Sequence, residues 1–173
     1  QSPDVFFLKD TDGDDVADMK ELALTGFGIE DSHHSISAWR RGPDGKIYFQ
    51  EGIFLNTQVE TQHGLVRNFN GGVYQYNPRT QELQMFARGT GGNPWGLVFD
   101  HWGQSFMANN PRILYLEPGT GAHMERPPIR PLITTEKQCG GDLASGTHLP
   151  HDIQGQFLTC RFKSRTVVRY EFV

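Results

Sequence analysis

The chain has 173 residues, with 16 Lys and Arg against 20 Asp and Glu and a formal net charge of −4 at pH 7. The charges are mixed in sign and no basic cluster alternates with aromatic residues, which argues against a nucleic-acid-binding face. No apolar run reaches the roughly 18 residues of a membrane-spanning helix, so we expect no membrane span. No signal peptide is present at the amino end, so an exported protein would already have lost it.

Glycine and proline are abundant, at 20 and 10 residues, and aromatic residues make up 12% of the chain. Long stretches with helical apolar spacing are scarce, so this composition predicts an all-β fold of short strands and many turns. The two cysteines, Cys139 and Cys160, fit no metal-binding or haem-attachment spacing. They could form one disulfide in an exported protein or remain two buried free thiols.

An acidic run follows the first predicted strand, residues 5–8. Read as a calcium-binding loop, the run supplies its ligands from Asp10, Asp12, Asp14, the carbonyl of Val16, Asp18 and Glu21. Carboxylates packed this closely repel one another unless a hard cation lies among them, so we predict a structural calcium site. The alternative is a solvated acidic turn, because Asp15 stands where such loops normally have glycine.

Asp31, His33 and His34 directly precede a predicted hairpin over residues 36–49. Imidazole titrates near neutral pH, so this segment is the candidate reaction centre at the mouth of a repeated sheet. In the alternative interpretation, the histidines only form local hydrogen bonds at a strand end. Adjacent residues of an extended segment point to opposite faces, so we expect only one histidine to face a central cavity.

Hairpins repeat from Ser35 onward. Strands are predicted over residues 36–40, 46–49, 73–76, 82–86, 96–99, 104–108, 113–116, 123–126, 156–160 and 167–172, with a long connection over residues 51–70. The turn glycines Gly45, Gly103 and Gly155 recur with a period of about 50 residues, which is typical of a four-stranded propeller blade.

The repeats predict a β-propeller of four-stranded antiparallel blades, about three and a half of which fit the chain. The predicted parts are an outer half-blade with the acidic loop (1–28) and three blades (33–89, 93–127 and 142–173). An open ring exposes sheet edges and blade faces. We therefore expect a fragment of a larger propeller, for example one of about six blades. The remaining blades would come from another chain or from self-association.

Several short motifs carry a family resemblance: DTDGD (10–14), LTGFG (24–28), DSHH (31–34), GPDG (42–45), GGVYQY (71–76), NP (93–94) and FDHWGQ (99–104). They resemble the PVC-type membrane-bound dehydrogenase β-propeller family, which is itself similar to soluble glucose and sorbosone dehydrogenases that use pyrroloquinoline quinone (PQQ). The resemblance implies a dehydrogenase-like propeller that oxidises a sugar or related alcohol with a quinone. In the full-length family a separate haem domain often accompanies the propeller.

The resemblance also implies roles for the histidines. In the quinone enzymes a histidine lies a fixed distance before the Gly-Pro-Asp turn and takes the proton of a sugar hydroxyl. His34 has that spacing from Gly42, and His33 falls where those enzymes usually carry an aspartate. This implies His34 as the catalytic base, oriented by Asp31 or His33, because neutral imidazole can accept and release the proton.

The quinone-binding motif departs from its counterpart. Where the relatives read Arg-Asn-Pro-Gln-Gly-Leu, residues 92–97 read Gly-Asn-Pro-Trp-Gly-Leu. Asn93 and Trp95 are the implied cofactor-binding residues, but Gly92 removes a charge-assisted hydrogen bond worth about 1.5 to 3 kcal/mol. Arg88 or Arg112 could compensate.

A second functional class therefore stays open. It is a non-catalytic propeller that binds a carbohydrate or a protein partner through His33, His34, Asn93 and Trp95, and a calcium-stiffened scaffold is a third option. The family resemblance and the all-carboxylate loop, which suits millimolar calcium, imply a bacterial periplasmic or extracellular location.

Overall fold

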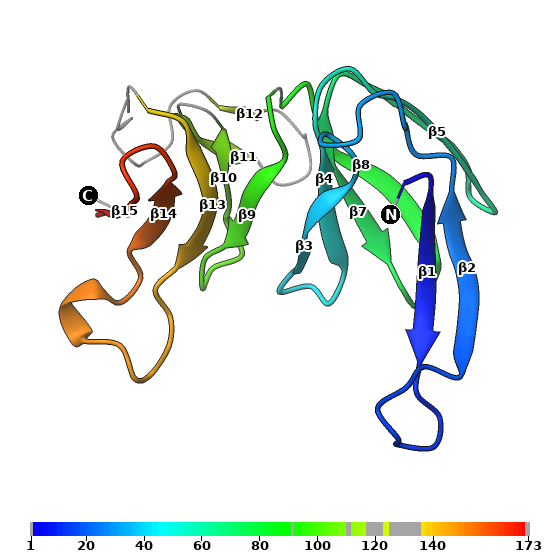
Figure 1. The fold of residues 1–173 in the computed structure, drawn as a ribbon, viewed down its shortest axis with the longest axis horizontal. Coiled ribbons are helices and arrows are strands. Elements are labelled where there is room, and N and C mark those ends of the chain that lie inside the picture. Colours follow the sequence, from blue (N-terminus) through cyan, green and yellow to red (C-terminus); the bar gives the residue numbers. More distant parts are fainter. Residues whose placement is uncertain (1, 91, 110–111, 117–122, 125–135, 172–173) are drawn as a thin grey trace.

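The computed structural model describes residues 2–90, 92–109, 112–116, 123–124 and 136–171, and in these ranges the chain is all-β, as predicted (Figure 1). The strands are β1 Asp4–Lys9, β2 Met19–Thr25, β3 Ser37–Arg41, β4 Ile47–Glu51, β5 Asn56–Thr61, β6 Gly64–Phe69, β7 Gly72–Asn77, β8 Glu82–Arg88, β9 Trp95–Phe99, β10 Ser105–Asn109, β11 Arg112–Leu116, β12 His123–Met124, β13 Gln138–Leu143, β14 Phe157–Arg161 and β15 Thr166–Tyr170, with a 3-10 turn η1 at His151–Ile153. No helix in the described part of the chain has the length and apolar character to cross a membrane.

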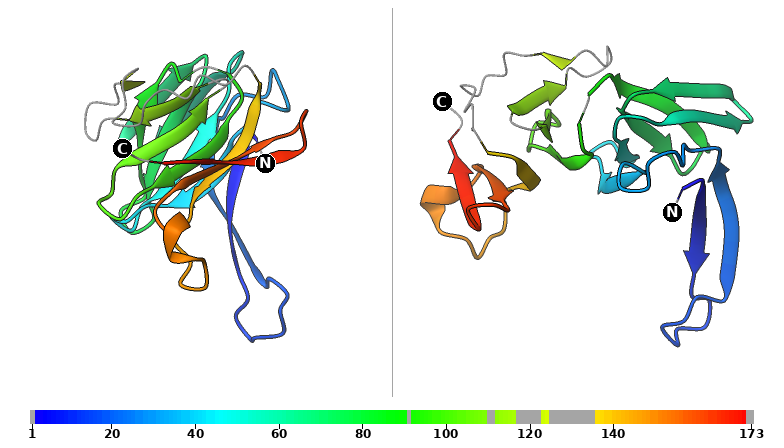
Figure 2. Two further views of the ribbon diagram at one scale, coloured as in Figure 1. Left: turned by 90° about the vertical axis from the view of Figure 1, so that its left-hand side faces the viewer. Right: turned by 45° about the horizontal axis from the view of Figure 1, so that its top comes forward.

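The strands form small antiparallel sheets. Two sheets have four strands each, in the orders β3-β4-β7-β8 and β12-β11-β10-β9, and a third sheet has the order β13-β14-β15. The hairpins β1-β2 and β5-β6 form two-stranded sheets of their own. The larger sheets follow one another along an arch, and the β1-β2 hairpin projects beyond it with the acidic loop at its tip (Figures 1 and 2).

Side chains on both faces of the larger sheets are buried. In β4, Phe49 packs with the residues of β1-β2 and β5-β6, whereas the next residue back, Tyr48, packs with β9 and β10. In β10, Met107 faces the first four-stranded sheet and Phe106 faces β14 and β15. Because successive strand residues point to opposite faces, apolar residues at consecutive positions cause the sheets to stack in series.

An aromatic group holds the segment after β2 against the first four-stranded sheet. The Phe27 ring lies edge-on to Phe49 and Tyr74, with ring centroids 5.6 and 5.4 Å away. The Trp39 ring stacks on Phe49, with ring centroids 4.2 Å apart. Offset and edge-to-face contacts between buried rings stabilise a fold beyond the area they bury.

The turn at residues 42–45 has the chemistry that the sequence predicts. Gly45 adopts a φ of 80°, and the Gly42 N–H donates to the carbonyl of Lys46 at 2.8 Å. The Asp44 carboxylate accepts hydrogen bonds from the Lys46 N–H at 3.1 Å and the Tyr48 hydroxyl at 2.9 Å. Burial raises the pKa of Tyr48 to about 12.

Two parts of the predicted strand pattern were wrong. The predicted connection over residues 51–70 contains the β5-β6 hairpin, in which Thr57 and Val59 point inward between polar neighbours. The strand β13, Gln138–Leu143, was not predicted, and it completes a three-stranded sheet with β14 and β15. Residues 125–126 and 172 of two predicted strands lie outside the described residues.

The cysteines lie opposite each other on neighbouring strands. Cys139 in β13 pairs in register with Cys160 in β14, and both are free thiols. Cys160 is exposed and Cys139 is partly exposed, so neither thiol is fully buried.

We expect Phe49→Ala to lower the free energy of unfolding by about 3 to 5 kcal/mol, because it opens a cavity within the aromatic group. Urea denaturation measures this change. Trp102→Ala is the matched control, since 81% of Trp102 is exposed. A similar loss of stability in the two variants would contradict the packing described above.

Candidate functional site

One carboxylate contacts both histidines of the predicted reaction centre. The Asp31 Oδ1 lies 2.6 Å from the Nδ1 of His33, and its Oδ2 lies 3.1 Å from the Nδ1 of His34. The two imidazole rings lie with centroids 4.0 Å apart. The structure therefore brings all three predicted catalytic residues together.

A tight turn produces this arrangement. The His34 N–H donates to the carbonyl of Asp31 at 3.1 Å, and the His33 N–H donates to the Asp31 carboxylate at 3.3 Å. The segment is therefore bent where the sequence predicted an extended chain. The turn places both rings against Asp31.

The two histidines differ sharply in exposure. The His33 side chain is 68% exposed, whereas the His34 side chain is 6% exposed. The His34 ring lies 5.7 Å from the ring of Phe54, and its Nδ1 has no aligned hydrogen-bond partner among the described residues. His33 therefore presents the solvent-accessible imidazole, which is not the position that the resemblance implied for a base.

The close approach of His34 requires glycine at position 52. A Cβ at Gly52 would lie 2.8 Å from His34 Cδ2 and 2.9 Å from the carbonyl oxygen of Gly92. The Gly52 N–H donates to the carbonyl of His34 at 2.8 Å, and the Ile53 N–H donates to the carbonyl of Gly92 at 3.3 Å. Three segments that are distant in sequence thus meet at this point.

Residues 92–95 are the segment that the resemblance implies for cofactor binding. Asn93 is partly exposed, and the Trp95 indole N–H is buried without a hydrogen-bond partner among the described residues. Lys137, which the sequence did not indicate, places its ammonium 5.5 Å from the centroid of the Trp95 ring.

Of the two cations that could compensate for Gly92, Arg88 is held by another part of the chain. Arg88 donates to the carbonyl of Arg67 at 2.6 Å and to Asn68 at 3.3 Å. The side chain of Arg112 lies outside the described part. One amide and one ammonium are too few donors for a cofactor with three carboxylates, so the described residues do not fit PQQ.

The acidic loop gathers three of its predicted ligands. Asp10, Asp12 and Asp18 each contribute one carboxylate oxygen, and these three oxygens lie within 4.8 Å of one another. Asp31, His33 and His34 form a second such group. Both groups could hold a cation by geometry, but each is also held together by internal hydrogen bonds.

Backbone N–H groups set the shape of the acidic loop. Asp10 accepts hydrogen bonds from the N–H groups of Asp12, Gly13 and Asp15 at 3.1, 2.6 and 2.9 Å, and the bond from Gly13 is the main cause that lowers the Asp10 pKa. Hydrogen bonds from the Thr11 N–H and hydroxyl lower the pKa of Asp18 in the same way.

Two other predicted ligands, Asp14 and Glu21, are not part of this group. Asp14 accepts a hydrogen bond from the Val16 N–H at 2.8 Å, and Glu21 is in β2 opposite Phe7, beyond the loop. Gly13 and Asp15 have φ values of 83° and 68°, so the bend is divided between two residues. The loop therefore differs from an EF-hand, as the glycine position suggested.

The fold and the site define an all-β protein of serially stacked antiparallel sheets, with an Asp-His-His group in the loop before the first four-stranded sheet. A family model described as a domain of unknown function, DUF7133, matches residues 1–138, and the chain belongs to this family. The matched region includes the acidic loop, Asp31, His33, His34 and residues 92–97. The chain has no match among the curated proteins.

Proposed function

We propose that Asp31, His33 and His34 bind the hydroxyl groups of a sugar or related alcohol, on a segment of a β-propeller. The observation that carries this proposal is the contact of one carboxylate with both imidazoles. A carboxylate on the Nδ1–H of His33 fixes the tautomer, so the exposed Nε2 is left as a hydrogen-bond acceptor for a hydroxyl group. Phe54, which is 59% exposed, offers an apolar surface beside the ring of His34, 5.7 Å away.

The propeller part of the proposal is supported by sheet order and packing. The first four-stranded antiparallel sheet packs face to face on the second, and the second packs on the three-stranded sheet, as neighbouring blades of a propeller do. The β1-β2 hairpin exposes Phe6, Phe7, Leu8 and Leu22, between 40 and 57% each. Further blades, from another chain or a second copy, would cover these apolar residues.

Alcohol oxidation is the second candidate. A histidine oriented by an aspartate can accept the proton of a hydroxyl group, and in this role His33 is the accessible base. Oxidation also requires a hydride acceptor, for which the family resemblance implies a quinone. Since residues 92–95 do not fit PQQ, binding of a hydroxylated ligand is the better supported of the two functions.

For an aldose that binds the parent protein, we expect His33→Ala to weaken binding by about tenfold, because it removes a hydrogen-bond partner of the ligand. Calorimetric titration over a panel of aldoses measures this effect. His63→Ala is the matched control, because His63 lies in the exposed turn between β5 and β6 and binds the carbonyl of Thr80.

A dye-linked oxidation assay with added PQQ separates the two candidates. Turnover that falls by about two or more orders of magnitude in His33→Ala would favour the enzyme. Binding without turnover would favour the binding protein. The hydroxyl-binding proposal fails if no aldose binds, or if His33→Ala binds as well as the parent.

We also propose that the acidic loop binds calcium as a structural ion. Asp10, Asp12 and Asp18 would supply carboxylate oxygens, and water and loop carbonyls would complete the six to eight ligands that calcium takes. The ion would relieve the repulsion between the three carboxylates and stiffen the tip of the β1-β2 hairpin. Such a loop suits the millimolar calcium of the periplasm or extracellular space, where we place the protein.

If the loop binds calcium, Asp12→Ala should abolish the rise in melting temperature that calcium produces. Glu21→Ala should retain that rise, because Glu21 lies beyond the loop in β2. Thermal shift with calcium and with a chelator measures the two responses. If the melting temperature of the parent protein changes with neither calcium nor chelator, the loop is a solvated turn.

A further inference from the structure

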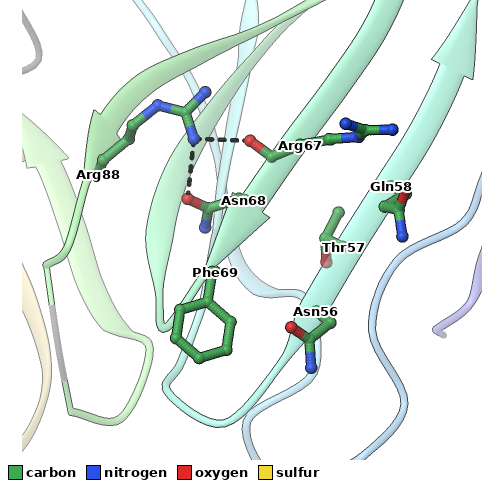
Figure 3. A pocket seen from close by; sticks show the side chains of 7 residues that line it. All are labelled: Asn56, Thr57, Gln58, Arg67, Asn68, Phe69 and Arg88. Carbon is green, nitrogen blue, oxygen red and sulfur yellow. Dashed lines mark hydrogen bonds between the residues drawn. The ribbon is translucent and has the colours of Figure 1, made fainter.

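A polar hollow of about 570 Å³ lies against the β5-β6 hairpin (Figure 3). Its lining residues come from β5, β6 and the end of β8, and they are Asn56, Thr57, Gln58, Arg67, Asn68, Phe69 and Arg88. Two of these side chains are cationic and none is acidic. The hollow therefore has the charge to receive an anion.

Arg88 is held in place at one side of the hollow. Its Nη1 donates to the carbonyl of Arg67 at 2.6 Å and to the Oδ1 of Asn68 at 3.3 Å, as the dashed lines of Figure 3 show. Its other guanidinium N–H groups form no hydrogen bond with a described residue. A guanidinium fixed through one nitrogen loses less side-chain freedom when it binds a carboxylate through the others.

A buried carboxyl group sets the orientation of Asn68. The Nδ2 of Asn68 donates to Glu51 Oε1 at 2.6 Å, which turns the amide oxygen toward Arg88. The other oxygen of Glu51 accepts the hydroxyl of Thr57 at 2.6 Å, and that hydroxyl accepts the Gly28 N–H at 2.9 Å. Glu51, Thr57 and Asn68 are 1, 1 and 6% exposed, so the support behind the hollow is fixed by packing.

As a purely structural feature, the hydrogen-bond network around Glu51 is energetically unfavourable. Glu51 is nearly inaccessible, and its hydrogen bonds to described residues come from neutral side chains. Burying a carboxylate away from water is unfavourable unless it is well compensated. Burial, together with the nearby Glu51 charge, also raises the pKa of Tyr74, whose hydroxyl has no hydrogen-bond partner among the described residues. A role in orienting Arg88 gives this cost a functional reason.

The remaining lining residues favour a sugar ring. Phe69 is 61% exposed and offers an aromatic face, and Figure 3 shows its ring and Arg88 on either side of Asn68. The amide of Gln58 forms no side-chain hydrogen bond with a described residue, so it is free to contact hydroxyl groups. Asn56 is held at the rim by Glu30, 3.1 Å from its Nδ2.

We propose that this hollow binds a uronic acid or a uronate unit of an acidic carbohydrate. The carboxylate pairs with the guanidinium of Arg88, the sugar ring packs on Phe69, and Glu51 is a positioning residue that acts through Asn68. This site goes beyond the proposed function and uses none of Asp31, His33 or His34. Substitutions at Arg88 therefore test it separately from the histidine site.

The test is calorimetric titration with galacturonate, with galactose and inorganic sulfate as reference ligands. Galacturonate should bind more tightly than either reference. Arg88→Gln should weaken galacturonate binding by about tenfold or more, because a charge-assisted hydrogen bond is lost. Arg88→Lys should also weaken galacturonate binding, since an ammonium lacks the planar fork of a guanidinium. Arg79→Gln removes the same charge from the exposed β7-β8 turn and should leave the affinity within about twofold.

Chemical-shift changes in the unaltered protein give a readout that requires no variant. On titration with galacturonate, the side-chain signals of Arg88 and Phe69 should shift and those of Arg79 should not. The proposal is overturned if galactose or sulfate binds as tightly as galacturonate. Equal losses in Arg88→Gln and Arg79→Gln, or shifts confined to residues outside the hollow, would overturn it as well.

Discussion

The structure depends on strands whose two faces are both apolar. Phe49 and Tyr48 are neighbours in β4, and they belong to cores on opposite sides of the same sheet. In β9, Leu97 packs in the core between the two four-stranded sheets. Its neighbour Val98 packs in the core between the second of these sheets and β13-β14-β15. A sheet built from such strands must be covered on each face, because an uncovered face would leave large side chains in water. The serial stacking of sheets follows from this constraint.

The stacking also places the functional groups. Connections between sheets meet where Gly52 passes His34 and where Ile53 donates to Gly92, so loops from three parts of the chain form one surface. Glu51, the last residue of β4, immediately precedes Gly52 and holds the network behind Arg88. The end of one central strand therefore supports both the histidine site and the hollow beside β5-β6. Rigid strands that end in loops with polar groups are a common basis for binding sites.

Sequence reasoning succeeded where local chemistry decides the structure. The Pro-Asp-Gly turn before β4 and the apolar strands around it were predicted correctly, because turn residues and periodicity act over a few positions. The polar alternation of β5 was missed, since Thr57 faces inward to a partner, Glu51, that only the folded chain provides. Asp31 and the two histidines were recognised as a group, but not the turn that places both rings on one carboxylate. The contacts of Arg88 could not be predicted, because they join strands across about 20 residues.

The proposed propeller requires further cover over the exposed apolar side chains of β1-β2. Sedimentation velocity of the chain over a range of concentrations, together with limited proteolysis, tests it most directly. We expect concentration-dependent self-association, which Phe7→Gln with Leu22→Gln should reduce, because both side chains are more than half exposed on that hairpin. A monodisperse, protease-resistant monomer at every concentration would contradict it.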